Sequence, residues 1–195
     1  EVYRYAKRCD FQQVSNARGC PMGCDYCTVH LVAGNKIRNR PTNDVITELS
    51  QRGLLNGDKN DTTFFTADNF GKPEDIELLK RLEVVLDGRE FHWLAQVGID
   101  ALYNQEFLKL ANRIGNATLG VGIESPFREG LAAFKKGIRG KSPEEAFSIV
   151  KDFSRITTMA LLMVGFDFEP TSVFEDMNRF VRQLQPDGVY LSILT

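Results

Sequence analysis

Short apolar runs alternate with amphipathic stretches along almost the whole chain. Six of the runs are nearly continuous in apolar residues, which is typical of strands that are covered on both faces. They occupy residues 11–17, 61–68, 91–98, 117–123, 159–166 and 187–194. The stretches between them carry apolar residues at helical spacing. The pattern therefore predicts an α/β protein in which six strands are separated by helices.

The predicted helices carry recognisable start and stop signals. In residues 41–53, Thr42 or Asn43 is a candidate N-cap and Gly53 a candidate stop. Pro73 falls in the first turn of a helix over 72–86, the helical position that tolerates proline best. Further helices are predicted over 104–115, 129–137, 142–154 and 172–184.

This alternation of strands and helices predicts a parallel sheet with right-handed crossovers. Such a sheet is either doubly wound or curled into a barrel, and the pattern alone leaves both open. No repeat, linker or low-complexity tract divides the 195 residues, so we expect one domain. The chain starts without methionine and its last predicted strand reaches the C-terminus, so we expect an excised or truncated segment of a longer protein.

In both architectures, ligands bind at the carboxyl ends of the parallel strands. Polar or glycine residues follow five of the predicted strands. They are the cysteine-rich segment 18–28, the residues TADNFG at 66–71, Gln96 with Asp100, Glu124 with Ser125, and Gly165 with Asp167. Because these ends share one edge of a parallel sheet, we expect the residues to surround one site.

Composition narrows the class of protein. Hydrophobic residues make up 43% and charged residues 26% of the chain, the balance of a soluble globular protein. The longest apolar run, 159–166, is far shorter than the roughly 20 residues of a membrane span. The net charge of −2 offers no basic face for nucleic acid, and Lys36, Arg38 and Arg40 are better explained as solvated surface. Nucleic acid is therefore not expected as a partner.

Four cysteines in a chain without secretion features indicate a reducing compartment, so we expect a cytoplasmic protein. Cys9 is expected to be a small buried hydrophobe. Cys20, Cys24 and Cys27 form a C-x3-C-x2-C segment on a glycine-containing loop. A zinc site needs four ligands, for which His30 is the nearby candidate. An iron–sulfur cluster fits better, because cubane clusters are held by closely spaced thiolates. Three ligands on a four-iron cluster leave one iron open, which suggests catalysis rather than simple electron transfer.

This segment resembles that of the radical S-adenosylmethionine (SAM) superfamily, because Tyr26 precedes the last cysteine and the segment follows the first strand of a βα series. The stretches RGCPMGCDYCTV, RNRP, TADNFG, FHWLAQVGID, GVGIES and VGFDFEP are similar to the subgroup whose longer members often carry a cobalamin-binding domain. The resemblance implies a radical SAM core domain over residues 1–195, with any cobalamin-binding domain outside this chain. It also implies a parallel (β/α)6 partial TIM-like barrel.

The resemblance implies the cofactors and the chemistry. In the family, SAM binds the open iron of a 4Fe–4S cluster, and one electron from the reduced cluster breaks a carbon–sulfur bond of SAM. The resulting 5′-deoxyadenosyl radical takes a hydrogen atom from the substrate. For this chain we expect methylation or rearrangement at an unactivated carbon of a small-molecule or lipid-like substrate. A reductant such as flavodoxin or ferredoxin is implied, and cobalamin, if used, would come from the other domain.

The resemblance also assigns residues by their position in the motifs, although it assigns none to catalysis itself. It implies that Cys20, Cys24 and Cys27 bind the cluster. Tyr26 would lie against the adenine of SAM, and Gly165 would lie near the same ring.

Five further residues are implied as cofactor contacts. Glu124 and Ser125 match a motif that lies near the ribose and methionine parts of SAM, and Gln96 would face SAM or the substrate. Asp68 and Asn69 occupy the place where many members contact the SAM amino group through Gly-Gly-Glu, so the chain departs from the family there. From the residues alone, Glu124 could instead cap the next helix, and Asp68 with Asn69 could shape a turn.

Other interpretations remain open at this stage. Asp100 could be the N-cap of the helix that contains Phe107. No D-x-H-x-x-G cobalamin motif occurs, since His30 and His92 lie in other contexts. A methylthiotransferase or tRNA-modifying enzyme would share the core, although the expected basic surface is missing. A non-catalytic zinc or electron-transfer module is a third interpretation.

Overall fold

The computed structural model describes residues 11–57, 61–133 and 142–194. Six strands form one parallel sheet in the order β1-β4-β5-β6-β7-β8, which is also their order along the chain. Their bounds are Gln12–Val14, Thr62–Phe70, Phe91–Gly98, Gly115–Glu124, Ile156–Val164 and Gly188–Ile193. Each crossover moves one position in the same direction, whereas a doubly wound sheet reverses its order at a switch point. The fold is therefore a (β/α)6 partial barrel, as predicted.

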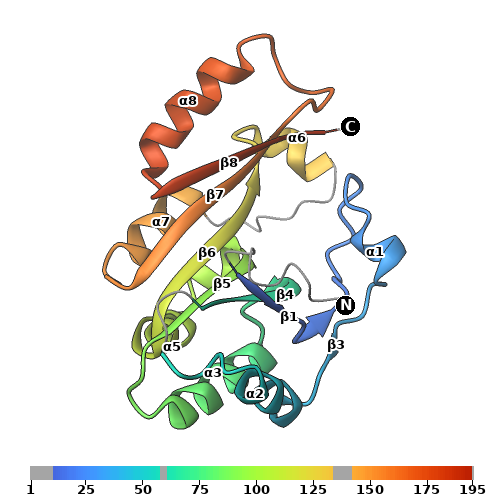
Figure 1. Cartoon of the computed structure of the whole chain (residues 1–195). Coiled ribbons are helices and arrows are strands. Elements are labelled where there is room, and N and C mark those ends of the chain that lie inside the picture. The colour runs from blue at the N-terminus through green and yellow to red at the C-terminus, as the bar shows by residue number, and fades with distance from the viewer. Residues whose placement is uncertain (1–10, 58–60, 134–141, 195) are drawn as a thin grey trace.

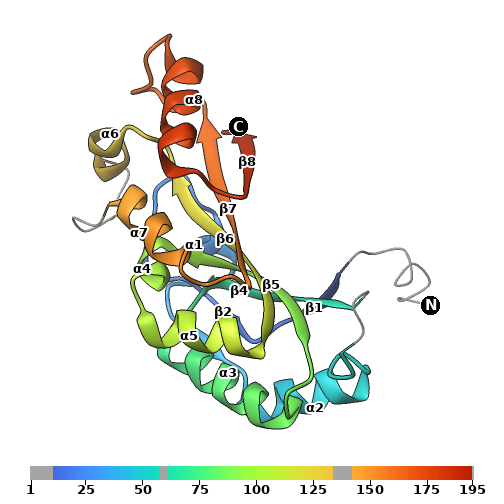
Figure 2. The ribbon, with the colours of Figure 1, turned by 90° about the vertical axis from the view of Figure 1, so that its left-hand side faces the viewer.

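The sheet is curved and its longer helices lie along the outer face, whereas the short helix that follows the cysteines lies on the other side (Figures 1 and 2). The longer helices are α2 (Thr42–Gln51), α3 (Pro73–Leu86), α5 (Gln105–Ile114), α7 (Pro143–Val150) and α8 (Val173–Leu184). Shorter helices are α1 (Val29–Val32), α4 (Ile99–Leu102) and α6 (Arg128–Ala133). Among the described residues, no helix is both long and apolar enough to cross a membrane.

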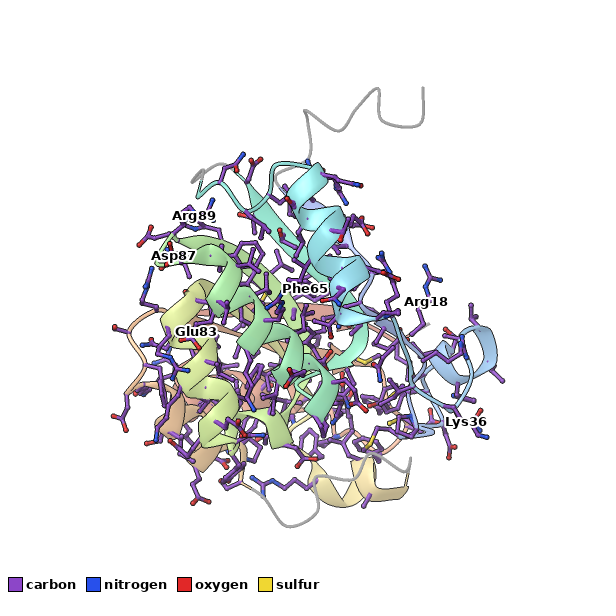
Figure 3. All side chains as sticks on the ribbon, turned by 90° about the horizontal axis from the view of Figure 1, so that it is seen from below. Arg18, Lys36, Phe65, Glu83, Asp87 and Arg89 are labelled. Atoms are coloured by element: carbon purple, nitrogen blue, oxygen red, sulfur yellow. The ribbon has the colours of Figure 1, made fainter. Side chains whose placement is uncertain are left out.

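A cluster of aromatic side chains fills the space between the sheet and the outer helices. Phe65 on β4 is fully buried and packs on Phe70, Phe91 and Trp93, with ring centroids 5.4 to 6.2 Å apart. Figure 3 shows Phe65 beneath the helices. Alternate residues of β4, β5, β6 and β7 are buried, whereas most of the residues between them are only partly buried or exposed.

Some predicted boundaries were wrong. The strand predicted over 11–17 is divided: β1 ends at Val14, and β2 (Ala17–Arg18) pairs instead with β3 (Arg38–Asn39) in a separate two-stranded sheet. Helix α2 has Pro41 at its N-cap rather than Thr42 or Asn43. Strand β4 continues through Phe70, so residues 66–70 belong to the strand instead of following it. The end of the helix predicted over 129–137 lies outside the described residues.

The division after β1 has a structural cause in the first turn of α3. Asp75 is 4% exposed, and its carboxylate accepts hydrogen bonds from the backbone N–H groups of Gly71 and Lys72, both at 2.9 Å. It also accepts one at 2.7 Å from Nδ2 of the buried Asn16, between β1 and β2. This carboxylate therefore holds the β1–β2 junction against the start of α3. Burial raises the pKa of Asp75 to about 6, although the N–H groups of Lys72 and Gly71 act in the opposite direction.

We predict that Asp75 makes stability fall as the pH rises. Because its pKa is higher in the folded protein than the ordinary 3.8, the folded state binds the proton more tightly. The resulting stabilisation is complete below about pH 4 and is lost as the pH rises through about 6, a change of about 3 kcal/mol. Asp75→Asn does not titrate. Urea unfolding at pH 4, 5, 6 and 7 should show the variant gaining stability relative to wild type as the pH rises, and a constant difference would contradict this.

Candidate active site at the carboxyl ends of the strands

The three clustered cysteines lie on a segment that is closed at its base by the β2–β3 ladder. Within it, the backbone N–H of Cys20 donates to the carbonyl oxygen of Gly34 at 3.2 Å. The N–H of Cys27 donates to the carbonyl oxygen of Cys24 at 3.0 Å, which closes a tight turn around the last two cysteines. The cysteine segment, residues 19–37, is therefore a folded loop with its own backbone hydrogen bonds.

A glycine fixes the entry into this loop. Gly19 has φ +98°, and a Cβ atom there would lie 2.2 Å from the carbonyl oxygen of Lys36. Its N–H donates to Oδ2 of Asp68 at 2.6 Å. A side chain at position 19 would have to displace backbone, so the loop can pack this closely only with glycine. Asp68 thus joins strand β4 to the first residue of the cysteine segment.

All three cysteines line one cavity of about 230 Å³. The cavity walls come from the cysteine segment and from the carboxyl ends of β4, β5, β6 and β7. Five residues that the sequence analysis assigned to cofactor contacts also line it: Tyr26, Asp68, Asn69, Gln96 and Glu124. Its apolar walls, which the sequence analysis missed, are Met22, Val29, Val97, Ile99 and Leu161. The expectation of one shared site is therefore correct for these residues.

The donor set fits a cluster better than a single ion. Cys20, Cys24 and Cys27 form no disulfide. Within the part of the chain that the structure describes, no three His, Cys, Asp or Glu side chains come close enough together to hold one metal ion. A cubane cluster places its thiolate ligands on separate iron atoms, so three sulfurs spaced around a cavity suit it. His30, the candidate fourth ligand for zinc, is not among the residues that line this cavity.

Tyr26 lies between the cysteines and an aromatic pair. Its ring meets Phe166 edge-on at 5.5 Å, and Phe166 stacks on Phe168 at 5.0 Å. Burial raises the pKa of the Tyr26 phenol well above its usual range, and the Glu124 carboxylate and the Cys24 thiol raise it further. The phenol is therefore neutral at physiological pH, and its apolar ring forms part of the cavity wall.

Two polar residues of β4 are held by the backbone of their neighbours. One oxygen of Asp68 is bound by Gly19, and Oδ1 of Asn69 accepts a hydrogen bond from the N–H of Gly98 at 3.0 Å. Asn69 therefore ties the end of β4 to the end of β5. Gln96 lines the cavity with an exposed side chain.

Glu124 is the last residue of β6 and has an unusual backbone. Its φ is +70°, and the register with β7 shifts between Gly122 and Glu124. A non-glycine residue in the left-handed region costs about 1 to 3 kcal/mol, and such strain is concentrated at functional sites. Glu124 thus combines a strained backbone with a side chain that lines the cavity near Tyr26.

Ser125 and Gly165 do not line the cavity. Instead, both bind Glu169, a residue that the sequence analysis did not single out. The Glu169 carboxylate accepts hydrogen bonds from the N–H groups of Gly165 (2.8 Å) and Phe166 (3.2 Å), and from the Ser125 hydroxyl at 3.3 Å. Glu169 thereby holds the ends of β6 and β7 together. Its position four residues after Gly165, in VGFDFEP, was the available signal.

The N-cap interpretation of Asp100 was wrong. Asn104 is the N-cap of α5, where its side chain accepts hydrogen bonds from the N–H groups of Glu106 and Phe107 at 3.1 Å. Asp100 lies in α4 and lines the cavity. Cys9 lies outside the described residues.

Comparison with known proteins agrees with this geometry. A partial parallel barrel with three thiols at the carboxyl ends of its strands is the arrangement of a barrel enzyme with a thiolate-bound metal cluster. The chain belongs to the radical SAM superfamily, because the model of that family matches residues 14–181. The family predicted from the cysteine segment is thereby confirmed.

Curated relatives align over most of this chain. The bacteriochlorophyllide d C-12(1)-methyltransferase of Chlorobaculum tepidum is 27% identical over 180 residues, which cover 91% of this chain and 39% of that protein. The ribosomal protein uS12 methylthiotransferase RimO of Chloroherpeton thalassium is 25% identical over 186 residues, covering 91% and 42%. The chain therefore spans less than half the length of these relatives.

Solved structures share the fold. The radical SAM methyltransferase TsrM from Kitasatospora setae, solved with cobalamin and a [4Fe-4S] cluster, matches with a TM-score of 0.81 at 17% identity. The match covers 99% of this chain and 38% of TsrM. The cobalamin-dependent radical SAM enzyme OxsB matches with a TM-score of 0.61 at 17% identity, covering 85% of this chain and 26% of OxsB. The predicted likeness to cobalamin-associated members is confirmed as a likeness of fold.

Proposed function

We propose that residues 1–195 form the catalytic core of a SAM-dependent radical enzyme that methylates or rearranges an unactivated carbon. The observation that carries this proposal is the shared cavity, where three thiols face the strand-end residues Asp68, Asn69, Gln96 and Glu124. When bound there, a 4Fe–4S cluster and SAM would supply the 5′-deoxyadenosyl radical. A cobalamin-binding domain, if present, would lie outside this chain.

The chain's own residues would hold and orient these groups. Cys20, Cys24 and Cys27 would bind three irons, and Tyr26 would cover the adenine of SAM. Glu124, with its strained backbone, would hold polar groups of SAM. Gln96 lies on the side of the cavity where β5 ends and would face SAM or the substrate. Asp68 would act mainly on the cysteine segment through Gly19, since that hydrogen bond already occupies one of its oxygens.

Ser125 and Gly165 would support the site indirectly through Glu169. Because their hydrogen bonds to Glu169 connect the ends of β6 and β7, they would set the spacing of Glu124 and Phe166 at the cavity. Glu169 already binds the Ser125 hydroxyl and the Gly165 N–H. Any contact of these two residues with SAM would therefore use their backbone carbonyl oxygens.

The relatives favour a methyltransferase acting on a small or lipid-like molecule. One relative methylates a bacteriochlorophyllide, and TsrM has been solved with tryptophan and a SAM analogue. A flavodoxin or ferredoxin would supply the electron, and the cytoplasm is the compartment that keeps clustered thiols reduced. The second candidate is a methylthiotransferase, favoured by the uS12 enzymes at 25% to 28% identity. Mass spectrometry of the modified substrate distinguishes the two, because only methylthiolation adds sulfur.

Electron paramagnetic resonance tests the proposal. The protein is reconstituted with iron and sulfide without oxygen, reduced, and measured with and without SAM. A cluster signal that changes on addition of SAM is expected, because SAM would bind the open iron. Bound zinc without sulfide would contradict the proposal, and so would a cluster signal that is indifferent to SAM.

We predict that Glu124→Gln weakens SAM binding without loss of the cluster. The change keeps the volume of the side chain and removes its charge, and a lost charged hydrogen bond costs about 1.5 to 3 kcal/mol. The dissociation constant for SAM, measured by equilibrium dialysis, should rise roughly 10- to 100-fold. Iron content should be unchanged. Glu77→Gln, at an exposed position on α3, is the matched control and should bind SAM as wild type does. If wild type, Glu124→Gln and Glu77→Gln bind SAM with equal affinity, Glu124 does not contact SAM and its role is structural.

A further inference from the structure

The cysteine segment and the β2–β3 ladder that closes it together carry an excess of positive charge that the proposed reaction does not use. Residues 17–39 contain three arginines or lysines, Arg18, Lys36 and Arg38, and one acidic residue, Asp25. The chain as a whole carries −2, so the remainder carries −4. All three basic side chains are exposed, and none has an ion-pair partner among the residues that the structure describes. Figure 3 shows Arg18 and Lys36 at one edge of the molecule, far from Asp87 and Arg89.

Two of these charges oppose each other directly. Arg18 on β2 is the register partner of Arg38 on β3 in the antiparallel ladder. Side chains at such positions start roughly 5 Å apart, and like charges there destabilise the pair. The ladder has only two residues on each strand, so this repulsion falls on the element that closes the cysteine segment. An anionic group bound over Arg18 and Arg38 would offset the repulsion between them.

The charged positions are in backbone contact with the cysteines. The carbonyl of Lys36 packs against Gly19, and the carbonyl of Gly34 binds the N–H of Cys20. The Arg38 guanidinium lies next to Gly34, where a Cβ atom would be 3.4 Å from it. A partner that binds these cations would therefore be separated from Cys20 only by the backbone of residues 34–36.

Apolar side chains lie on the same segment. Helix α1 starts two residues after Cys27, and its first residue, Val29, lines the cavity. Its other end points outward, with Leu31 76% exposed and Val32 86% exposed. A four-residue helix thus runs from the cavity wall to the solvent. Leu31 and Val32 thus place two exposed apolar side chains beside the basic ones on this part of the surface.

We propose that Arg18, Leu31, Val32, Lys36 and Arg38, here named the basic–apolar patch, dock a small acidic electron-transfer protein that reduces the cluster. The inference rests on the proposed function, since it needs a cluster on the three cysteines. In the step it describes, the donor is oxidised by one electron and the cluster is reduced from the 2+ to the 1+ state. SAM and substrate use the inner cavity, so the electron enters from the opposite side of the loop.

The observations favour a small acidic protein over nucleic acid. Nucleic-acid binding rests on a broad basic face, whereas this patch is confined to one segment of an otherwise acidic chain. Exposed leucine and valine have no role against phosphates, but they suit the apolar contact of a protein interface. Electron-transfer complexes are small and short-lived, and they depend on charge steering, which matches a patch of five residues.

The test compares two electron donors on the reconstituted protein. The donors are flavodoxin hydroquinone, an acidic protein, and reduced methyl viologen, a small cation. The variant is Arg18→Glu with Lys36→Glu, which replaces the Arg18–Arg38 repulsion by an opposite-charge pair and so should not harm the ladder. The matched control, Arg81→Glu with Lys109→Glu, makes the same charge change at exposed positions on α3 and α5. Stopped-flow absorbance follows the bleaching of the cluster.

Reduction by flavodoxin should slow at least 10-fold in the variant at low salt, and should lose its salt dependence. Reduction by methyl viologen should not slow, and the control should behave as wild type with both donors. Leu31→Ser with Val32→Ser should also slow flavodoxin selectively, whereas Val84→Ser, at a position 68% exposed on α3, should not.

Three results would overturn the inference. Unchanged flavodoxin kinetics in both patch variants would exclude docking there. Equal slowing with both donors would mean that the changes act on the loop itself. If the patch variants are reduced by flavodoxin as fast as wild type but retain less transfer RNA in a filter-binding assay, the basic–apolar patch binds nucleic acid instead. A wild-type protein that assembles no cluster would instead refute the proposed function, and the inference would fail with it.

Discussion

Cys24→Ala should abolish both cluster assembly and SAM cleavage while leaving the barrel folded. Cys24 is the most buried of the three cysteines, at 8% exposure, and it lines the cavity. Two thiolates cannot replace three on a four-iron cluster. Iron and sulfide content after reconstitution should fall close to zero, and 5′-deoxyadenosine formation should fall below detection. Far-ultraviolet circular dichroism should be unchanged, because the cysteine segment lies outside the sheet-and-helix core.

Thr28→Ala is the matched control for this change. Thr28 adjoins Cys27, is exposed, and makes no side-chain cap to α1. It should assemble a normal cluster and cleave SAM at the wild-type rate. Retained cleavage in Cys24→Ala would contradict the assignment of the cysteines, and loss of the fold would contradict the view that the cluster is not needed for the barrel.

Gly19→Ala should be nearly as damaging, although it removes no ligand. The new Cβ atom would lie 2.2 Å from the carbonyl oxygen of Lys36, and the φ of +98° is strained for alanine. The backbone must move, so the hydrogen bonds from Gly19 to Asp68 and from Cys20 to Gly34 would lengthen or break. We expect iron content to fall severalfold and SAM cleavage to fall at least 100-fold. Iron analysis and product formation measure the two effects.

Gly23→Ala is the control that tells steric overlap of the new Cβ atom apart from the strain of a positive φ. Gly23 lies in the same loop with a positive φ of +62°, but nothing lies within 4 Å of its added Cβ atom. This change should cost about 1 kcal/mol and leave the cluster intact. Similar losses in both variants would mean that backbone conformation alone, not the packing of Gly19 on Lys36, limits the loop.

Much of the fold could be predicted from local patterns. The apolar runs marked all six strands of the large sheet, although the expected cover on both faces is not seen, since β8 is largely exposed and the central strands bury only alternate residues. The choice between a barrel and a doubly wound sheet could not be made this way, since both use the same alternation of strands and helices. The break between Val14 and Ala17 was also hidden, because Asn16 bonds to Asp75, which is far away in the sequence.

The site was predicted where strand ends and the cysteine motif coincided. Asp68, Gln96 and Glu124 were found because parallel strands bring their carboxyl ends together. Ser125 and Gly165 met the same criterion but bind Glu169, one through its hydroxyl and the other through its backbone N–H, and such hydrogen bonds leave no periodic trace in a sequence. The strain at Glu124 was likewise invisible, because it arises from a register shift between β6 and β7.

The strict sequence order of the strands has a consequence during protein synthesis. Each strand of the large sheet pairs only with its neighbours along the chain, so the sheet can grow by one strand at a time as the nascent chain leaves the ribosome. The cysteine segment is made early, whereas the cavity wall is complete only after Leu161 has emerged. Until then, the thiols lack part of the wall that surrounds them in the folded chain. A cluster bound by the three cysteines, as proposed, would find its cavity wall complete only after β7 has joined the sheet.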